Sequence, residues 1–431
     1  MAPQPMASPT AGARLLAEFL GTFVLTFTVG CNVLLKTPVW GGMSVACGLM
    51  VVVQGLAGIS GAHFNPAVSL ASAVNRALGG HGLIPLQALK YSLVQMVAGI
   101  AAAWCASMMC HKNFDLAPSP GFGLWQAGLC EFLYAFMLCL VVLCMHLAAA
   151  AGPTDAFGVA IGFVMVAGIY GAGPISGGFF NPAISLGIDV AGYASGFGWC
   201  LAYLVFQLLG GVAAAFLFKV VRNEETGGLR RGLVPELTSE FVGTYVLVLT
   251  LGLNVLAKSP AEALSVGAAL ACMTYAFSGV SGANFNPAVT LAVLVSSRSP
   301  RGTARKTGGQ ACMAMGVQLL AGILGAMTYS AVYLGGSFRL GPGSHLANWD
   351  AVVAVEFVFT FLLCYVFLCT TLSEATASPP MHGLAIGLCA TLGMVAAKFF
   401  AAGALNPAIS VGVVAAHRFG DSGLFAAGAF S

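Results

Sequence analysis

The stretch GGFFNPAIS, from Gly177 to Ser185, places an Asn-Pro-Ala tripeptide inside a strongly apolar region of the chain. Asparagine is a preferred helix N-cap residue, and proline fits the first helical turn. The stretch therefore predicts a helix that begins at Pro182. The apolar run behind it is only about ten residues long, half of what a membrane crossing needs. We expect a half-helix that starts near the middle of a bilayer.

The same tripeptide occurs four times at regular spacing. Its copies lie in GAHFNPAVS, GGFFNPAIS, GANFNPAVT and GALNPAIS, and they comprise Asn65, Pro66, Ala67, Asn181, Pro182, Ala183, Asn286, Pro287, Ala288, Asn406, Pro407 and Ala408. A glutamate opens an apolar segment ahead of each copy, at Glu18, Glu131, Glu240 and Glu356. The distances from glutamate to asparagine are 47, 50, 46 and 50 residues. This alternation indicates a duplication of a duplication, because isolated Asn-Pro turns would not keep such spacing.

The composition is that of a membrane protein. Of the 431 residues, 58% are hydrophobic and only 7% are charged, against about 25% charged in soluble domains. Apolar segments of roughly 20 residues recur and are too uniformly apolar for barrel strands, which predicts an all-α, multi-pass protein in a lipid bilayer. No basic run suggests nucleic acid, and no motif suggests a metal, a cofactor or an enzyme. The 13 cysteines lie mostly in apolar segments and are expected to pack in the core.

Each quarter of the chain contains three expected crossings and one half-helix, so successive quarters enter the membrane from opposite faces. This is the inverted repeat of channels and transporters. We predict a tail at residues 1–13, a first unit at 14–220, a linker at 221–235 and a second unit at 236–431. By analogy with the first unit, the last crossing of the second should begin near Ser422. The chain ends at Ser431, so we expect that helix to be incomplete.

Charge placement predicts the orientation of the chain. With the N-terminus and the linker in the cytoplasm, eleven cations lie on the cytoplasmic side: Arg14, Arg76, Lys90, Lys219, Arg222, Arg230, Arg231, Arg298, Arg301, Arg305 and Lys306. Six lie outside: Lys36, Lys112, Lys258, Arg339, Lys398 and Arg418. The excess on the cytoplasmic side agrees with the positive-inside rule.

Two inverted quarters bring two half-helix N-termini together at the membrane centre. Each N-terminus carries a positive partial charge of about half an elementary charge. The pair disfavours cations and hydronium, while the asparagine amides face whatever passes. The pattern therefore predicts selection for neutral molecules that accept hydrogen bonds.

With these motifs in place, the chain resembles the aquaporin (major intrinsic protein) family. GISGAHFNPAVSLA is similar to the first loop motif of that family, and AEFLGTFVLTF to its first helix. The resemblance covers almost the whole chain twice, which implies two tandem helical barrels and a passive channel for water or small neutral solutes such as glycerol. It also implies that the four glutamates hold the re-entrant loops. Since the family forms tetramers of barrels, we expect two chains to pair into a four-barrel assembly.

The sequence departs from the family at the expected selectivity filters. The family usually has arginine three residues after the second asparagine of each pore, and this chain has Ile184 and Ile409 there. Spacing assigns the remaining filter positions to Val45, Ile169 and Gly178 in the first unit, and to Val266, Met394 and Gly403 in the second. We expect apolar filters that favour partly apolar solutes. We also expect His63 and Asn284 in the pore vestibules. Lys398 either projects its charge into the outer vestibule of the second pore or, as we favour, reaches outer water or lipid head groups.

Two other readings stay open at this point. A secondary transporter also has inverted repeats with broken helices, and it would need ionisable groups at the midplane for coupling. The regular intramembrane acids are the four glutamates, which have a scaffold explanation. A membrane scaffold or junction protein with occluded pores is the other alternative, because apolar constrictions resist wetting.

Overall fold

The computed structural model describes residues 9–37, 39–146, 156–222, 232–296, 306–342, 348–373, 375–401 and 403–421. Over these ranges the chain forms fifteen α-helices and one 3-10 turn, and no strand. Eleven of the helices are long and apolar enough to cross a membrane. The prediction of an all-α membrane protein built from tandem units is thus confirmed.

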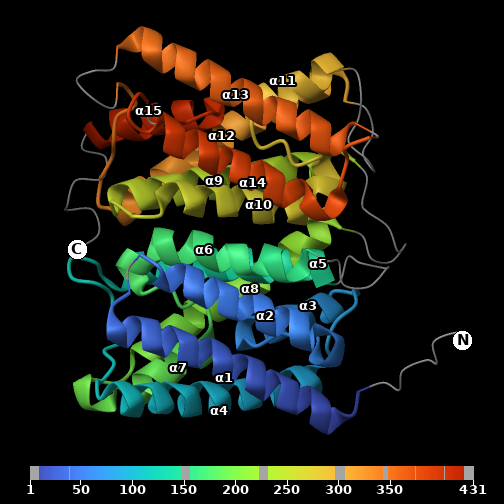
Figure 1. Cartoon of the computed structure of the whole chain (residues 1–431). Helices are drawn as coiled ribbons and strands as arrows, with labels where there is room; N and C mark the ends of the chain where they lie inside the picture. Colours follow the sequence, from blue (N-terminus) through green and yellow to red (C-terminus); the bar gives the residue numbers. More distant parts are fainter. Residues whose placement is uncertain are drawn as a thin grey trace, which may run out of the picture.

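The helices fall into two groups that lie one above the other in Figure 1. The first unit contains α1 (Ala11–Leu35), α2 (Gly41–Ser60), α3 (Pro66–Ala77), α4 (Pro85–Cys110), α5 (Leu124–His146), α6 (Phe157–Ser176), α7 (Pro182–Ala191) and α8 (Trp199–Val221), with a 3-10 turn at Tyr193–Ser195. The second unit contains α9 (Leu233–Leu256), α10 (Glu262–Ser281), α11 (Pro287–Ser296), α12 (Gly308–Val332), α13 (Trp349–Thr371), α14 (Pro379–Ala397) and α15 (Pro407–Asp421). We call the end of the bundle where α1 begins the N face.

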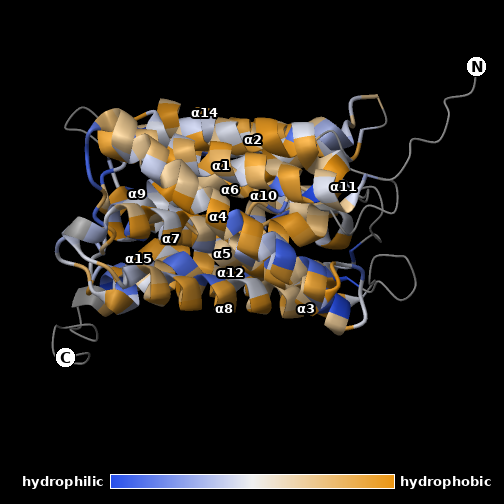
Figure 2. Ribbon diagram, turned by 90° about the horizontal axis from the view of Figure 1, so that it is seen from below, coloured by the Kyte–Doolittle hydropathy of each residue, from blue (hydrophilic) through white to orange (hydrophobic). Residues whose placement is uncertain are grey.

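The described helices α9 to α15 of the second unit repeat α1 to α7 of the first. The predicted last crossing of the second unit, from about Ser422, falls on residues 422–431, which lie outside the described ranges. Within the described ranges, 11% of the apolar segment of α13 is buried, against 78% in the equivalent α5, which also contacts α8 and α10. The outward surfaces of the long helices are largely apolar, as lipid contact requires (Figure 2).

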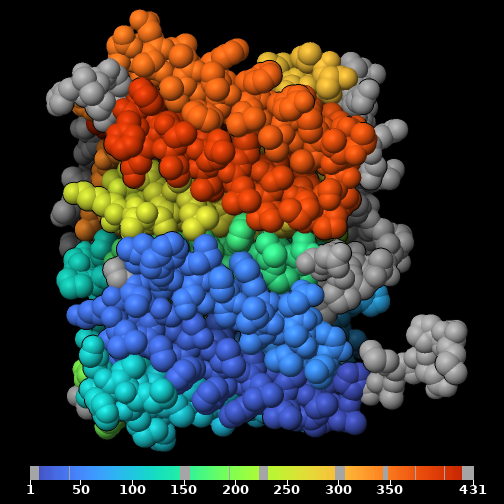
Figure 3. Space-filling view, in the orientation of Figure 1, coloured from blue at the N-terminus to red at the C-terminus, as the bar shows by residue number. Residues whose placement is uncertain are grey.

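The two units touch along a broad contact (Figure 3). Helices α5 and α6 of the first unit pack against α9 and α10 of the second. Hydrogen bonds among the described residues cross between the units: the hydroxyls of Tyr134 and Thr250 lie 2.9 Å apart, the Ser265 hydroxyl donates to the Ala167 carbonyl at 3.0 Å, and Arg222 at the end of α8 donates to the Ala276 carbonyl at 3.0 Å. These hydrogen bonds pair buried or partly buried polar groups inside an apolar interface and help to fix the relative position of the two units.

Glycines let the half-helices of the second and fourth quarters approach their neighbours. A Cβ atom on Gly99 of α4 would lie 2.2 Å from the Ala183 carbonyl oxygen of α7. In the second unit, a Cβ on Gly322 of α12 would lie 2.3 Å from the Ala408 carbonyl oxygen of α15. Only glycine permits this backbone approach, and it places α7 and α15 close to the centre of each unit.

Candidate pores

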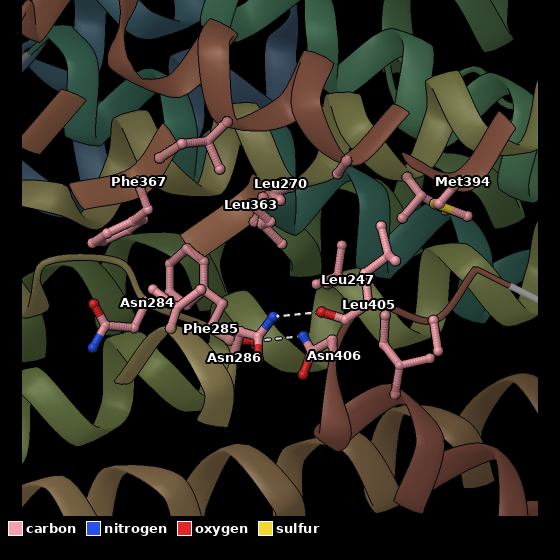
Figure 4. A pocket seen from close by; sticks show the side chains of 16 residues that line it. Leu247, Leu270, Asn284, Phe285, Asn286, Leu363, Phe367, Met394, Leu405 and Asn406 are labelled. Atoms are coloured by element: carbon pink, nitrogen blue, oxygen red, sulfur yellow. Dashed lines mark hydrogen bonds between the residues drawn. The ribbon is translucent and has the colours of Figure 1, made fainter. Parts of the chain in front are cut away.

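The four asparagines meet in two pairs, one in each unit. In the first unit, the Nδ2 atom of Asn65 donates to the Phe180 carbonyl and that of Asn181 donates to the Phe64 carbonyl, both at 2.9 Å. In the second unit, the junction is repeated between α11 and α15 and is drawn in Figure 4. There Asn286 donates to Leu405 and Asn406 donates to Phe285, again both at 2.9 Å.

Each asparagine also caps its own half-helix. The side-chain oxygen of Asn65 accepts from the Ala67 backbone N–H at 2.8 Å, and that of Asn181 accepts from Ala183 at 3.0 Å. Asn286 and Asn406 make the same bond to Ala288 and Ala408, both at 2.9 Å. An amide group has two N–H hydrogens, and the junction uses one of them. The other is left at the point where two positive helix ends face each other.

The residue before each asparagine adopts a left-handed backbone conformation. The φ angles are 48° at Phe64, 52° at Phe180, 51° at Phe285 and 50° at Leu405. Such a conformation costs a non-glycine residue roughly 1–2 kcal/mol. It turns the carbonyl of this residue toward the opposite asparagine. The strain occurs at the same place in all four quarters, so the junction geometry must be held from elsewhere.

Glutamates hold the loops of the first unit. The Glu18 carboxylate is fully buried and accepts from the backbone N–H groups of His63 and Phe64, from the Ser60 hydroxyl and from the Gln95 amide, at 2.5–3.0 Å. The Glu131 carboxylate is also fully buried. It accepts from Phe179, Phe180, Ser176 and Gln207 at 2.7–3.1 Å. Four donors on each carboxylate fix the loop against its helix.

The glutamates of the second unit have different partners. Glu240 accepts from Asn284, Phe285 and Gln318 at 2.7–3.0 Å, and the Nζ atom of Lys306 forms an ion pair with its carboxylate at 4.0 Å. Glu356 is only partly buried and accepts from two backbone N–H groups, those of Ala404 and Leu405, both at 2.9 Å.

A small cavity surrounds the asparagine pair of the second unit. Its volume is about 30 Å³, and it is lined by Asn284, Asn286 and Asn406 together with apolar side chains. In Figure 4, Asn284 and Phe367 lie at one end of the cavity and Met394 at the other, with the asparagine pair between them. A cavity of this size holds only about one or two water molecules.

Two cavities lie along the described part of the first unit, one lined by the paired asparagines and the other toward the outer end. The inner one, of about 10 Å³, is lined by Asn65, Asn181 and His63 among apolar residues. The outer one has a volume of about 550 Å³, and part of its wall is the α9–α10 connection of the second unit at Ala257, Ser259 and Pro260. A wide outer chamber therefore leads to a narrow centre.

The predicted filter residues gather beside these cavities. In the first unit, Val45, Ile169 and Gly178 line the outer chamber, and Ile184 lines the inner cavity. In the second unit, Val266, Met394 and Ile409 line the cavity around the asparagine pair, and a Cβ on Gly403 would lie 3.1 Å from the Met394 Cα atom. None of these eight positions carries a polar side chain.

The three predicted vestibule residues lie in different surroundings. His63 and Asn284 line the inner cavities of their units. Lys398 is exposed at the C-terminal end of α14 and does not line the cavity of the second unit.

Several pore residues escaped the sequence analysis. Leu138, Val142, Ile161 and Met165 line the inner cavity of the first unit, and Leu363, Phe367, Ile386 and Ala390 occupy the matching places in the second. The sequence does indicate that these two groups of residues are equivalent, because they are related by the same offset as Asn181 and Asn406. The role of Lys306 could not be found in this way, since its counterpart in the first unit is not a cation.

A bundle of membrane-spanning helices with paired half-helices meeting over a narrow cavity defines a class of protein, the helical membrane channels. Comparison with known proteins gives the family. The profile of the major intrinsic protein family matches residues 6–163, 147–255 and 232–430. The chain therefore belongs to the major intrinsic protein family, whose members are passive channels and not enzymes.

Individual relatives align with about half of the chain. A probable NIP-type aquaporin of Nicotiana alata is 28% identical over 49% of the chain and 78% of its own length. Aquaporin NIP3-1 of Oryza sativa subsp. japonica is 32% identical over 52% of the chain and 73% of its length. A glycerol uptake facilitator-like protein of Lactiplantibacillus plantarum is 29% identical over 49% of the chain and 99% of its length. The protein is thus a multi-pass membrane channel for water or small solutes.

Proposed function

We propose that the chain carries two separate pores, one in residues 14–220 and one in 236–431, and that both pass water and small neutral solutes such as glycerol. The observation that carries this proposal is the repeated asparagine pair, with two helix N-termini directed at one cavity in each unit. Those N-termini disfavour cations at the pore centre. The apolar residues at the eight filter positions favour solutes with C–H surface.

The solute assignment draws on the chemistry of the lining and on the relatives. The cavity walls are apolar except for the asparagines, Asn284 and His63. A relative in Lactiplantibacillus plantarum is described as a glycerol uptake facilitator, and plant relatives are described as aquaporins. Cation exclusion rests on the half-helix dipoles alone, because no filter arginine is present.

Stopped-flow light scattering of proteoliposomes tests the proposal. Vesicles with the protein should shrink quickly under a sucrose gradient and should reswell quickly under a glycerol gradient. Replacing Asn181 or Asn406 by aspartate puts a negative charge at one pore and should remove part of both fluxes. Fluxes equal to those of empty vesicles would contradict the proposal.

One observation favours a second candidate, a membrane scaffold with closed pores. The central cavities, of about 10 and 30 Å³, are smaller than glycerol, so side chains must move for glycerol to pass. A scaffold would show no permeability to either solute together with strong self-association.

We also propose the orientation predicted from charge, with the N face in the cytoplasm. The Lys219 ammonium donates to the Leu78 carbonyl, so the end of α8 lies beside the end of α3 at the N face. Labelling of single cysteines introduced at the two faces with an impermeant maleimide tests this orientation. Reaction from outside at the N face would reverse it.

Two chains are proposed to pair into a four-barrel assembly. The α9–α10 face that docks on the first unit contains a polar group in which Asn254 donates to the Thr250 carbonyl and to the Ser265 hydroxyl, both at 2.8 Å. The α1–α2 face repeats it with Asn32, which donates to the Thr28 carbonyl at 2.8 Å and to the Ser44 hydroxyl at 3.0 Å. The first copy is buried, whereas the second is exposed on an unpartnered face.

The partner face is the exposed surface of α13 and α14, which corresponds to α5 and α6. Docking of α1–α2 of one chain on α13–α14 of another, twice, closes a ring of four units. Native mass spectrometry should show two chains. Thr28→Trp on the α1–α2 face should give single chains, while Leu93→Trp on the exposed face of α4 should not; single chains in the unmodified protein would contradict the assembly.

A further inference from the structure

The N-face half of the second pore contains two buried hydrogen-bond acceptors without a partner. The Oδ1 atom of Asn284 has no hydrogen-bond partner among the described residues, although its Nδ2 atom donates to the Thr290 hydroxyl at 3.2 Å. The Nε2 atom of His382 is equally unpartnered within the described ranges. Both side chains are nearly fully buried, at 3% and 5% exposure.

His382 lies on the same face of α14 as three cavity-lining residues. Ile386, Ala390 and Met394 all line the cavity of the second unit. His382 precedes Ile386 by four residues, which places it on the same face of the helix, one turn closer to the N face. Its ring makes an edge contact with the Phe367 ring, with centroids 5.7 Å apart, and Phe367 lines the cavity beside Asn284 (Figure 4).

A threonine sets the tautomer of this histidine. The Thr370 hydroxyl donates its hydrogen to the Val366 carbonyl at 2.8 Å, and the same oxygen lies 3.1 Å from the Nδ1 atom of His382. With its hydrogen used, the hydroxyl oxygen acts as the acceptor, so we assign the hydrogen of the neutral imidazole to Nδ1. The Nε2 atom then carries a free lone pair, which makes it an acceptor like Oδ1 of Asn284.

The first unit lacks this arrangement. At the offset that relates Asn181 to Asn406, His382 corresponds to Phe157 and Thr370 corresponds to Met145. Phe367 corresponds to Val142 at the same offset, and Asn284 corresponds to His63 at the offset that relates Asn65 to Asn286. The pair of buried acceptors is therefore specific to the second pore.

We propose that Nε2 of His382 and Oδ1 of Asn284 form a solute subsite in the second pore that accepts hydrogen bonds from the hydroxyls of a small polyol. A buried acceptor that stays unpaired is costly, and a passing hydroxyl group relieves that cost. The surrounding Phe367, Leu363 and Ile386 contact the C–H surface of the same molecule. The subsite makes the second pore the one that prefers polyols, and the first pore the one that carries mainly water. This inference rests on the proposed channel function.

Permeability of single-pore variants tests the subsite. Val45→Trp, added to each variant of the second pore, should block the first pore, because Val45 lines the outer chamber of that pore. The ratio of glycerol to water permeability is then measured at about pH 8, where histidine is neutral. His382→Phe, which installs the residue of the first unit, should lower the ratio about fivefold through loss of one hydrogen bond. His382→Gln offers an amide oxygen and should restore most of the ratio.

Thr370→Val is the second variant, and it keeps the test valid if His382→Phe does not fold. It leaves the imidazole in place but removes the acceptor that holds the hydrogen on Nδ1. Part of the population then carries the hydrogen on Nε2, so the ratio of glycerol to water permeability should fall by about twofold. As a transplant control, Met145→Thr with Phe157→His should raise the ratio of the first pore in a background where Met394→Trp blocks the second. Size-exclusion profiles check the folding of each variant.

The outcomes separate the two proposals. If the unmodified protein conducts neither water nor glycerol, the channel function itself fails. If it conducts and the Val45→Trp background does not, the second pore is closed and the subsite is wrong while the channel function stands. An unchanged ratio in His382→Phe and in Thr370→Val, or no recovery in His382→Gln, also overturns the subsite.

Discussion

The two units of the chain share the asparagine junction but hold it differently. In the first unit, each loop is fixed by a fully buried glutamate that accepts four hydrogen bonds. In the second, one glutamate faces a lysine at 4.0 Å and the other is partly exposed with two donors. The four pore-centre amide bonds are nevertheless all 2.9 Å long. The asparagine junction is therefore the same in both units, whereas the glutamate contacts that hold its loops differ between them.

The glutamates give the largest expected difference between the units. Glu131→Ala leaves four donors unpaired in a buried site and should lower the free energy of unfolding by on the order of 5 kcal/mol. Glu356→Ala leaves two donors in a partly exposed site, and the expected loss is roughly 2 kcal/mol. Thermal unfolding in detergent, followed by tryptophan fluorescence, measures both. Equal losses would show that the extra donors on Glu131 add nothing.

The close helix approaches should respond alike in both units. Gly99→Ala and Gly322→Ala each push a methyl group into a carbonyl oxygen that now lies 2.2–2.3 Å from the ideal Cβ position. We expect each to cost about 2–3 kcal/mol by overpacking, and to lower permeability through its own pore. If either substitution leaves the free energy of unfolding unchanged in the same assay, α7 and α15 are not packed in an equivalent way.

The lysine specific to the second unit should have a smaller effect. Lys306→Met removes the positive charge that lies 4.0 Å from the Glu240 carboxylate. The carboxylate keeps its three hydrogen-bond donors. The expected loss is about 1–2 kcal/mol, below the 3–5 kcal/mol typical of tightly bonded buried pairs, because the 4.0 Å separation is long. Leu83 precedes Gln95 by twelve residues, as Lys306 precedes Gln318, so Leu83→Lys in the first unit is the control, and it should not raise stability. A gain in stability from Lys306→Met would mean that burying the ammonium costs more than its attraction returns.

The contact between the units should show the smallest effect. Tyr134→Phe removes the hydroxyl that lies 2.9 Å from the Thr250 hydroxyl. Interhelical hydrogen bonds in membranes contribute about 0.6 kcal/mol on average, so the melting temperature should fall only slightly. Tyr245→Phe, which removes a bond to Thr328 inside the second unit, is the matched control. A large fall for Tyr134→Phe alone would make this bond the main link between the units.

Much of this arrangement could be predicted from the sequence because it depends on short-range signals. The Asn-Pro pairs dictate where the half-helices begin, and α7 has the ten residues expected of it. The first unit was expected to end at residue 220, and its last crossing is observed as Trp199–Val221. The spacing of the glutamates from the asparagines likewise predicted the tandem repeat.

Other features depend on packing between distant segments and could not be predicted. The approach of Lys306 to Glu240 joins two segments that differ between the units. The contact of His382 with Phe367 and the 550 Å³ outer chamber shared by the two units arise only after folding. α15 also runs to 15 residues, longer than the half-helix expected from its motif, since nothing in its apolar run marks an earlier end.

Two parallel pores with apolar filters are the central claim, and glycerol flux through filter variants tests it most directly. Stopped-flow reswelling should be measured for the unmodified protein, for Ile184→Arg, for Ile409→Arg and for the double variant, at equal protein density. The account predicts a partial loss in each single variant, with the larger loss for Ile409→Arg, and a fall to the rate of empty vesicles in the double variant. Full glycerol flux in the double variant would contradict both the filter assignment and the two-pore account.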